Sequence, residues 1–97
     1  MVATDEFSVE LSRPAAADFQ RLVVWLRARD PKAAAHLGER LEDATDSLGT
    51  HPHRGRLIDE TVRELTLPFG RDGYILRYEV LGRRVIVTRL WHSLEHR

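Results

Sequence analysis

The period of apolar and polar residues changes twice along the chain. Near the N-terminus, Phe7 to Leu11 alternates apolar and polar residues, which predicts a short strand. From there to Leu48, apolar residues recur at intervals of three and four, which is the spacing of one helix face. Beyond Val62 the period returns to two. The pattern therefore predicts a strand, then a helical region, then a sheet.

The helical region divides into two helices at Asp30-Pro31. Ser12 is the predicted N-cap of the first helix, with Pro14 in its first turn, and this helix runs to about Arg29. Asp30 caps the second helix and Pro31 suits its first position. So short a link makes the pair a helical hairpin. The core-facing stripes are Phe19, Leu22, Val23 and Leu26, then Ala34, Leu37, Leu41, Ala44 and Leu48.

The second half of the chain predicts three strands after a loop at 51–56. The loop is indicated by its proline and glycine content. The fold class expected is α+β in the order β-α-α-β-β-β, with the helical hairpin on one face of a small, largely antiparallel sheet. The strands are Val62 to Leu67, Tyr74 to Leu81 and Arg84 to Trp91, separated by a turn region at Pro68 to Gly73 and a tight loop at Gly82-Arg83.

A two-residue loop at Gly82-Arg83 sets the register of the last two strands. Tyr78 then faces Val87 and Val80 faces Val85, and we assign this face, with Leu76, to the helices. A slip of one residue would exchange the two faces. The second face mixes apolar and polar residues and is not a clean solvent face: Ile75, Arg77, Glu79, Ile86, Thr88, Leu90 and His92.

Length and charge narrow the function classes. The chain of 97 residues predicts one domain, residues 1–97. Fifteen basic residues balance fifteen acidic ones, so the net charge is zero. Proteins that hold nucleic acid mainly through phosphates carry a basic excess, so we expect no direct sequence-specific nucleic-acid binding. No apolar run has membrane-spanning length, and Met1 to Glu6 lacks the profile of a secretory signal. We expect a cytoplasmic protein without membrane contact.

The numbers and spacing of cysteine and histidine argue against bound metals and cofactors. The chain has no cysteine, which excludes disulfides and thiolate chemistry. His51 and His53 form one histidine pair, and His92 and His96 form another. Neither pair has an acidic or thiol ligand beside it with metal-site spacing. We expect no metal and no cofactor, with His51 and His53 solvated in their loop.

The element order, taken with particular segments, resembles the ParE/RelE superfamily of bacterial toxins. The resemblance runs from about Phe7 to Arg97. It implies the fold predicted above and the role of toxin in a type II toxin–antitoxin pair, neutralised by a ParD-like or other small DNA-binding antitoxin in a hetero-oligomeric complex. The segments that carry it are Val9 to Ser12, Ala15 to Asp18, His51 to Arg56, Val62 to Leu65, Gly73 to Val80 and Val85 to His92.

Two branches of this superfamily differ in chemistry. RelE-like members are ribosome-dependent endoribonucleases, whereas ParE-like members lack the nuclease residues and act on DNA gyrase. In RelE-like toxins an arginine typically follows the Gly-Tyr pair, but here Ile75 follows Gly73-Tyr74. Metal-free RNA cleavage needs such a cation at the scissile phosphate. Lys32 is also the only lysine, whereas docking on ribosomal RNA requires a basic surface. We expect a ParE-like gyrase inhibitor and no enzyme.

Two alternatives remain open. The first is a RelE-like ribosome-dependent mRNA interferase, in which Arg63, Arg77 and His92 line one concave surface with His92 as acid or base. We favour the plainer interpretation that these three side chains are polar packing or antitoxin contacts, and we assign no catalytic residue. The second alternative is a non-toxic binding module of the same fold.

Partner contacts are predicted from apolar side chains outside the core stripes. Val24, Trp25 and Ala28 widen the apolar surface of the first helix beyond one core face, and aromatic residues are enriched at interfaces. With Leu90 of the sheet, these residues are the expected antitoxin contacts. The resemblance to ParE-like toxins implies target contacts at the end of the sequence, although Trp91 better suits the edge of a small core: Trp91, His92, His96 and Arg97.

Overall fold

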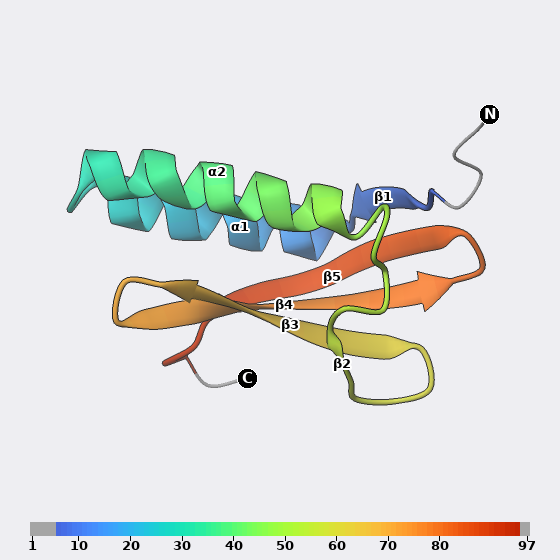
Figure 1. Ribbon diagram of the computed structural model, residues 1–97. Coiled ribbons are helices and arrows are strands. Elements are labelled where there is room, and N and C mark those ends of the chain that lie inside the picture. Colours follow the sequence, from blue (N-terminus) through green and yellow to red (C-terminus); the bar gives the residue numbers. More distant parts are fainter. Residues whose placement is uncertain (1–5, 96–97) are drawn as a thin grey trace.

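Two helices lie side by side over one face of a five-stranded sheet (Figure 1). The computed structural model describes residues 6–95. The predicted fold class is confirmed, with one short strand, β2, added where only a loop was expected. The elements are β1 (Ser8–Leu11), α1 (Arg13–Arg27), α2 (Pro31–Ser47), β2 (Arg56–Leu57), β3 (Val62–Phe69), β4 (Asp72–Leu81) and β5 (Arg84–His92).

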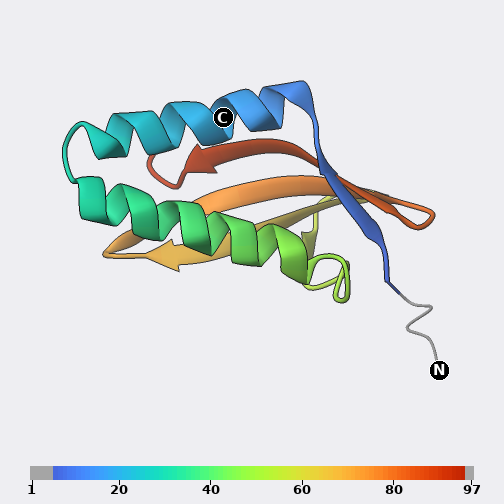
Figure 2. The same cartoon turned by 90° about the horizontal axis from the view of Figure 1, so that it is seen from above.

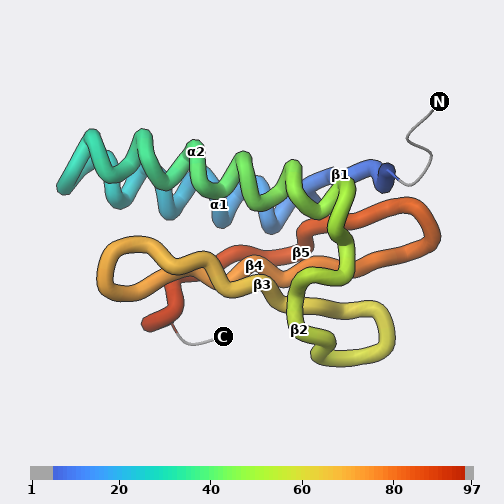
Figure 3. Tube along the Cα trace, in the orientation of Figure 1, coloured from blue at the N-terminus to red at the C-terminus, as the bar shows by residue number. Residues whose placement is uncertain are grey.

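The sheet pairs the first strand in the sequence, β1, with the last, β5. Its strand order is β1-β5-β4-β3-β2, and β1 pairs with β5 in parallel while every other pair is antiparallel. Seen from above, α1 lies over the β5 side of the sheet and α2 over the β3 side (Figure 2). The chain leaves α2 and descends from the helical layer to β2 at the far edge of the sheet (Figure 3).

Ser12 begins α1 and also fastens it to the sheet. Its side-chain oxygen accepts a hydrogen bond from Ala15 N at 3.2 Å, as an N-cap does. The Ser12 backbone N–H donates to Val87 O at 2.9 Å, and its hydroxyl donates to Thr88 O at 3.1 Å. Asp30 caps α2 in the same way, accepting from Ala33 N at 3.1 Å. Both predicted caps are confirmed.

The core lies between the helical hairpin and the upper face of the sheet. The predicted stripes point into it, with Phe19, Val23 and Leu26 only partly buried at its margin. The register expected for β4 and β5 is confirmed, because Tyr78 pairs with Val87 and Val80 with Val85. The largest fully buried side chains are Leu37, Leu41, Leu48, Leu76, Tyr78, Val85 and Val87.

A β-bulge in β5 overturns part of the face assignment. Tyr78 pairs with Val87 but Arg77 pairs with Arg89, so Thr88 is an extra residue on β5. One extra residue shifts the alternation of every side chain beyond it. Leu90 therefore lies opposite Leu76 on the helix face. The prediction that Leu90 and His92 belong to the outer face is wrong.

The turn between β3 and β4 is tighter than predicted. The two strands pair as far as Phe69 and Asp72, which leaves Gly70 and Arg71 as the loop. Gly70 has a φ of 62°, a conformation that favours glycine. Gly73 is required for a different reason, since a Cβ there would lie 2.5 Å from the Leu67 carbonyl oxygen. Pro68 is tolerated within β3 because β2 pairs only with Arg63 and Glu64, which leaves Pro68 at an edge.

The two glycine environments predict opposite effects of one substitution. Gly73→Ala forces backbone apart and should destabilise the fold by about 1–3 kcal/mol. Gly38→Ala is the matched control, because nothing lies within 4 Å of a Cβ at Gly38 in α2. Replacing a helical glycine by alanine should stabilise by about 0.5–1 kcal/mol. Urea unfolding of both variants tests this, and equal shifts in the two midpoints would contradict it.

Candidate functional site

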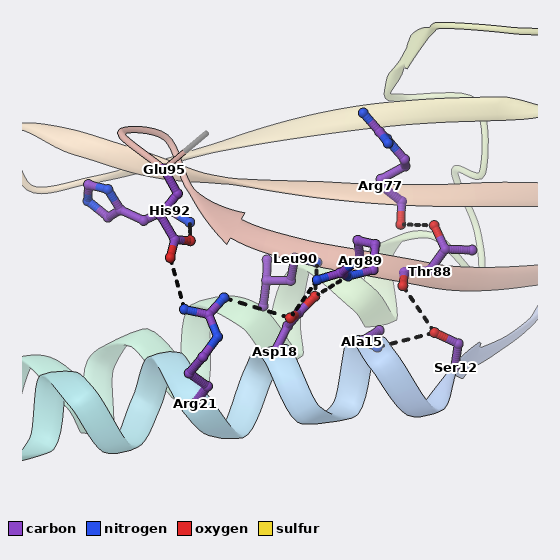
Figure 4. Close-up of polar contacts among 10 residues, drawn as sticks. All are labelled: Ser12, Ala15, Asp18, Arg21, Arg77, Thr88, Arg89, Leu90, His92 and Glu95. Carbon is purple, nitrogen blue, oxygen red and sulfur yellow. Dashed lines mark hydrogen bonds and ion pairs between the residues drawn. The ribbon is translucent and has the colours of Figure 1, made fainter. Parts of the chain in front are cut away.

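Asp18 connects α1 to the part of β5 whose outer edge is no longer paired with β1. β1 pairs with β5 only as far as Val87. Beyond it, the Leu90 N–H donates to the Asp18 carboxylate at 2.9 Å, and Arg89 donates to the same carboxylate from Nε at 2.8 Å and Nη2 at 3.2 Å (Figure 4). Asp18 is 5% exposed. Sequence reasoning missed it, although an acidic residue beside Phe19 and Leu22 on a core-facing stripe was a usable signal.

The surroundings keep Asp18 ionised. Burial alone would raise its pKa, but the hydrogen bonds from Arg89 and Leu90 and the charges of Arg89 and Arg21 lower the pKa below its usual value. A carboxyl whose pKa is lower in the folded state stabilises the fold above its unfolded pKa. That stabilisation is lost as the pH falls through the folded value.

We therefore predict that Asp18 makes unfolding pH-dependent. Asp18→Ala leaves the buried Leu90 N–H unpaired and should cost about 1–3 kcal/mol at pH 7. The variant should also lose part of the wild-type decline in stability below about pH 4, where the unfolded carboxyl takes up its proton. Urea unfolding at pH 7 and pH 3 measures both effects. Asp43→Ala, an exposed site on α2, is the control and should shift stability by less than about 0.5 kcal/mol.

The predicted antitoxin contacts fall on two separate surfaces. Val24 is 49% exposed and Trp25 is 56% exposed, and Ala28 is exposed beside them. Val24 lies on what we call the α1 groove, a mainly apolar hollow lined by Leu11, Ala16, Phe19, Gln20, Val23, Val24 and Arg27. Trp25 lies instead on the C-terminal pocket, a cavity of about 280 Å³ lined by Arg21, Leu22, Trp25, Tyr74, His92 and Glu95.

Leu90 is not available as a surface contact. It is 2% exposed, because the bulge turns it into the core. The target candidate Trp91 is also buried, at 6% exposed, with the Arg77 guanidinium 5.0 Å from its ring centre on the outer face of the sheet. His92 is partly buried, and its ring lies perpendicular to that of Tyr74, at 5.1 Å between centres. His96 and Arg97 lie outside the described residues.

The three candidate nuclease residues do not meet. Arg63 pairs across the ladder with Tyr78, and Arg77 pairs with Glu64. Adjacent positions of a ladder point to opposite faces, so the two arginines lie on opposite sides of the sheet. The prediction of one concave surface shared with His92 is therefore wrong.

Both arginines are engaged in packing contacts. Arg63 donates to the carbonyl oxygens of His53 at 3.1 Å and Gly55 at 2.8 Å, which holds the 51–55 loop. Arg77 donates to the Glu64 carboxylate at 2.6 Å. These contacts fit the plainer interpretation that both side chains are structural.

Comparison with known proteins now identifies the family. The sequence pattern of the family described as "ParE toxin of type II toxin-antitoxin system, parDE" matches residues 9–96. The chain belongs to this ParE toxin family. It is therefore a type II toxin of the ParE/RelE superfamily, as the resemblance predicted.

Curated relatives carry the RelE name. Toxin RelE1 of Caulobacter vibrioides is 54% identical over 91 residues, which cover 94% of this chain and 98% of the relative. Toxin RelE3 of the same organism is 38% identical over 90 residues, covering 93% of this chain and 98% of the relative. Family membership thus rests on nearly full-length matches.

Solved structures share the fold of this ParE-family toxin. A chain of the chromosomal ParDE system from P. aeruginosa superposes with a TM-score of 0.72 at 20% identity, covering 92% of this chain and 98% of that one. A chain of the RelBE2 toxin–antitoxin complex from Mycobacterium tuberculosis gives 0.61 at 18% identity, covering 95% and 97%. Within residues 6–95, no helix is both long and apolar enough to cross a membrane.

Proposed function

We propose that this toxin is neutralised by a cognate antitoxin seated on the α1 groove and that it inhibits DNA gyrase in the cytoplasm. The observation that carries the antitoxin surface is the groove itself, where Leu11 and Val24 remain 43% and 49% exposed. Both similar structures belong to toxin–antitoxin systems. Large exposed apolar side chains grouped around a hollow are typical of a partner surface.

The charge around the groove specifies the partner segment. The acidic side chain of α1, Asp18, is buried and ion-paired with Arg89. Among the residues that line the groove, the charged one is Arg27. Complementary charge sets the register and the partner of an interface. The antitoxin segment should therefore be amphipathic, with apolar side chains for the groove and an acidic side chain for Arg27.

A charge placed in the α1 groove should weaken the complex of toxin and antitoxin. Val24→Glu puts a carboxylate among apolar lining residues and should weaken antitoxin binding about 30-fold or more, the loss expected at an interface hot spot. Glu42→Ala on the exposed side of α2 is the control and should bind like the wild type. Titration of purified toxin with antitoxin measures both. Wild-type affinity of Val24→Glu would exclude the groove as the interface.

The proposal that DNA gyrase is the target rests on different observations from those for the antitoxin surface. Ile75 stands where RelE-like nucleases have arginine, Lys32 is the only lysine, and Arg63 and Arg77 lie on opposite sheet faces. These features support gyrase inhibition without covalent chemistry. The RelE names of the curated relatives favour the alternative, a ribosome-dependent mRNA interferase.

Induction of the toxin alone in bacteria distinguishes these functions. Gyrase inhibition should produce a DNA-damage response and filamentation, and the purified toxin should inhibit supercoiling. Arg77→Gln should keep that inhibition within about twofold, whereas a nuclease that uses Arg77 at the phosphate should lose about 100-fold or more. Rapid mRNA cleavage without DNA damage would overturn the gyrase proposal. Normal growth would identify a non-toxic binding module.

A further inference from the structure

The C-terminal turn, residues 93–95, is fastened to the helical layer by one carboxylate. Glu95 Oε2 accepts a hydrogen bond from Arg21 Nη1 of α1 at 2.9 Å. Its other oxygen, Oε1, accepts from the His92 backbone N–H at 2.9 Å. Figure 4 shows Arg21 reaching from α1 to Glu95 across the end of β5. We call this pair of contacts the clasp.

Further hydrogen bonds shape the turn that the clasp holds. The Ser93 N–H donates to Gly73 O at 2.9 Å, so the turn also contacts the start of β4. The Leu94 N–H donates to His92 Nδ1 at 3.1 Å, and the Glu95 N–H donates to His92 O at 2.9 Å. The turn thus has a defined shape, and the clasp sets its position relative to α1.

Two large apolar side chains close to the clasp are exposed to solvent. Leu94 is 70% exposed and Trp25 is 56% exposed, the two highest values among large apolar side chains of residues 6–95. Trp25, Arg21 and Glu95 all line the C-terminal pocket, and Leu94 directly precedes Glu95 in the chain. Large apolar side chains held in solvent gain nothing for the isolated fold, whereas they are typical of a contact surface.

Stability does not account for the clasp. The Arg21 and Glu95 side chains are 43% and 33% exposed, and ion pairs this exposed contribute little to folding. The clasp instead fixes the position of residues 93–95 relative to α1.

We propose that the Arg21–Glu95 clasp positions the C-terminal turn for contact with the toxin's target, which makes Arg21 and Glu95 positioning residues for toxicity. The inference rests on the proposed function, since it requires a toxin whose C-terminal end meets a target. The inference adds the Arg21–Glu95 clasp as the contact that fixes the position of residues 93–95. It also assigns Trp25 to the target side of the molecule, apart from the antitoxin in the α1 groove.

Alanine variants of the intact toxin test the clasp against a matched ion pair. Glu95→Ala and Arg21→Ala remove it, whereas Glu10→Ala removes the exposed Arg84–Glu10 pair, 2.6 Å long, at β1. Both clasp variants should keep the wild-type affinity for the antitoxin, and Glu95→Ala should keep the wild-type urea midpoint. Arg21→Ala also removes the 3.7 Å ion pair between Arg21 and Asp18, so its urea midpoint should fall slightly. Glu95→Ala should exchange the His92 amide proton at least about tenfold faster, because that N–H loses its acceptor. Growth arrest by both clasp variants should fall at least about tenfold. Glu10→Ala should match the wild type in every measurement.

Growth arrest by the clasp variants equal to that by Glu10→Ala would overturn the proposal. Should an alanine variant fail to fold, Glu95→Gln is the substitute, because its amide keeps only one acceptor oxygen and so can accept from Arg21 or from the His92 N–H but not from both. Growth arrest by a folded Glu95→Gln equal to that by the wild type would equally overturn the proposal. Failure of the wild-type toxin to inhibit purified gyrase, with growth arrest still dependent on Glu95, would reject the gyrase target and leave the clasp standing.

Discussion

The Asp18 carboxylate connects the two layers of this toxin. It accepts hydrogen bonds from the backbone N–H of Leu90 and from the guanidinium of Arg89, both in β5. These contacts lie beyond the point where β1 ends. A buried strand edge without a partner would leave a donor unpaired, at a cost of the order of 1–3 kcal/mol. By accepting that donor, α1 replaces the missing strand and is held against β5. The placement of α1, and with it of the groove, depends on this contact together with the hydrogen bonds of Ser12 to β5.

The fold was predictable wherever local chemistry and long-range packing agree. Ser12 and Asp30 signal their helices through capping, and the tight loop at Gly82-Arg83 sets the pairing of Tyr78 with Val87. The bulge at Thr88 was not found because strict alternation was assumed to continue. The spacing of apolar residues in β5, two from Val85 to Val87 and then three to Leu90, was the available signal. A break of this kind in a two-residue period marks a bulge.

The functional surfaces were less predictable than the fold. Exposure of Val24 and Trp25 followed correctly from their place beside the core stripe of α1. The assignment of these two side chains to different hollows was not predictable, because the C-terminal pocket beside Trp25 is completed by His92 and other residues far away in sequence. The nuclease arrangement failed for a related reason. Arg63 and Arg77 belong to neighbouring strands, and only the register decides on which side of the sheet each one points.

The parallel pairing of β1 with β5 also constrains when the molecule can be completed. Ser12 hydrogen-bonds to Thr88, 76 positions later, and Asp18 binds Leu90 across a similar span. During synthesis the N-terminal half can form its helices early, but β1 and α1 have no strand to pair with or pack against until β5 has left the ribosome. Contacts of such long range form late and slowly. A nascent chain of this toxin therefore remains without its finished sheet until β5 has been made.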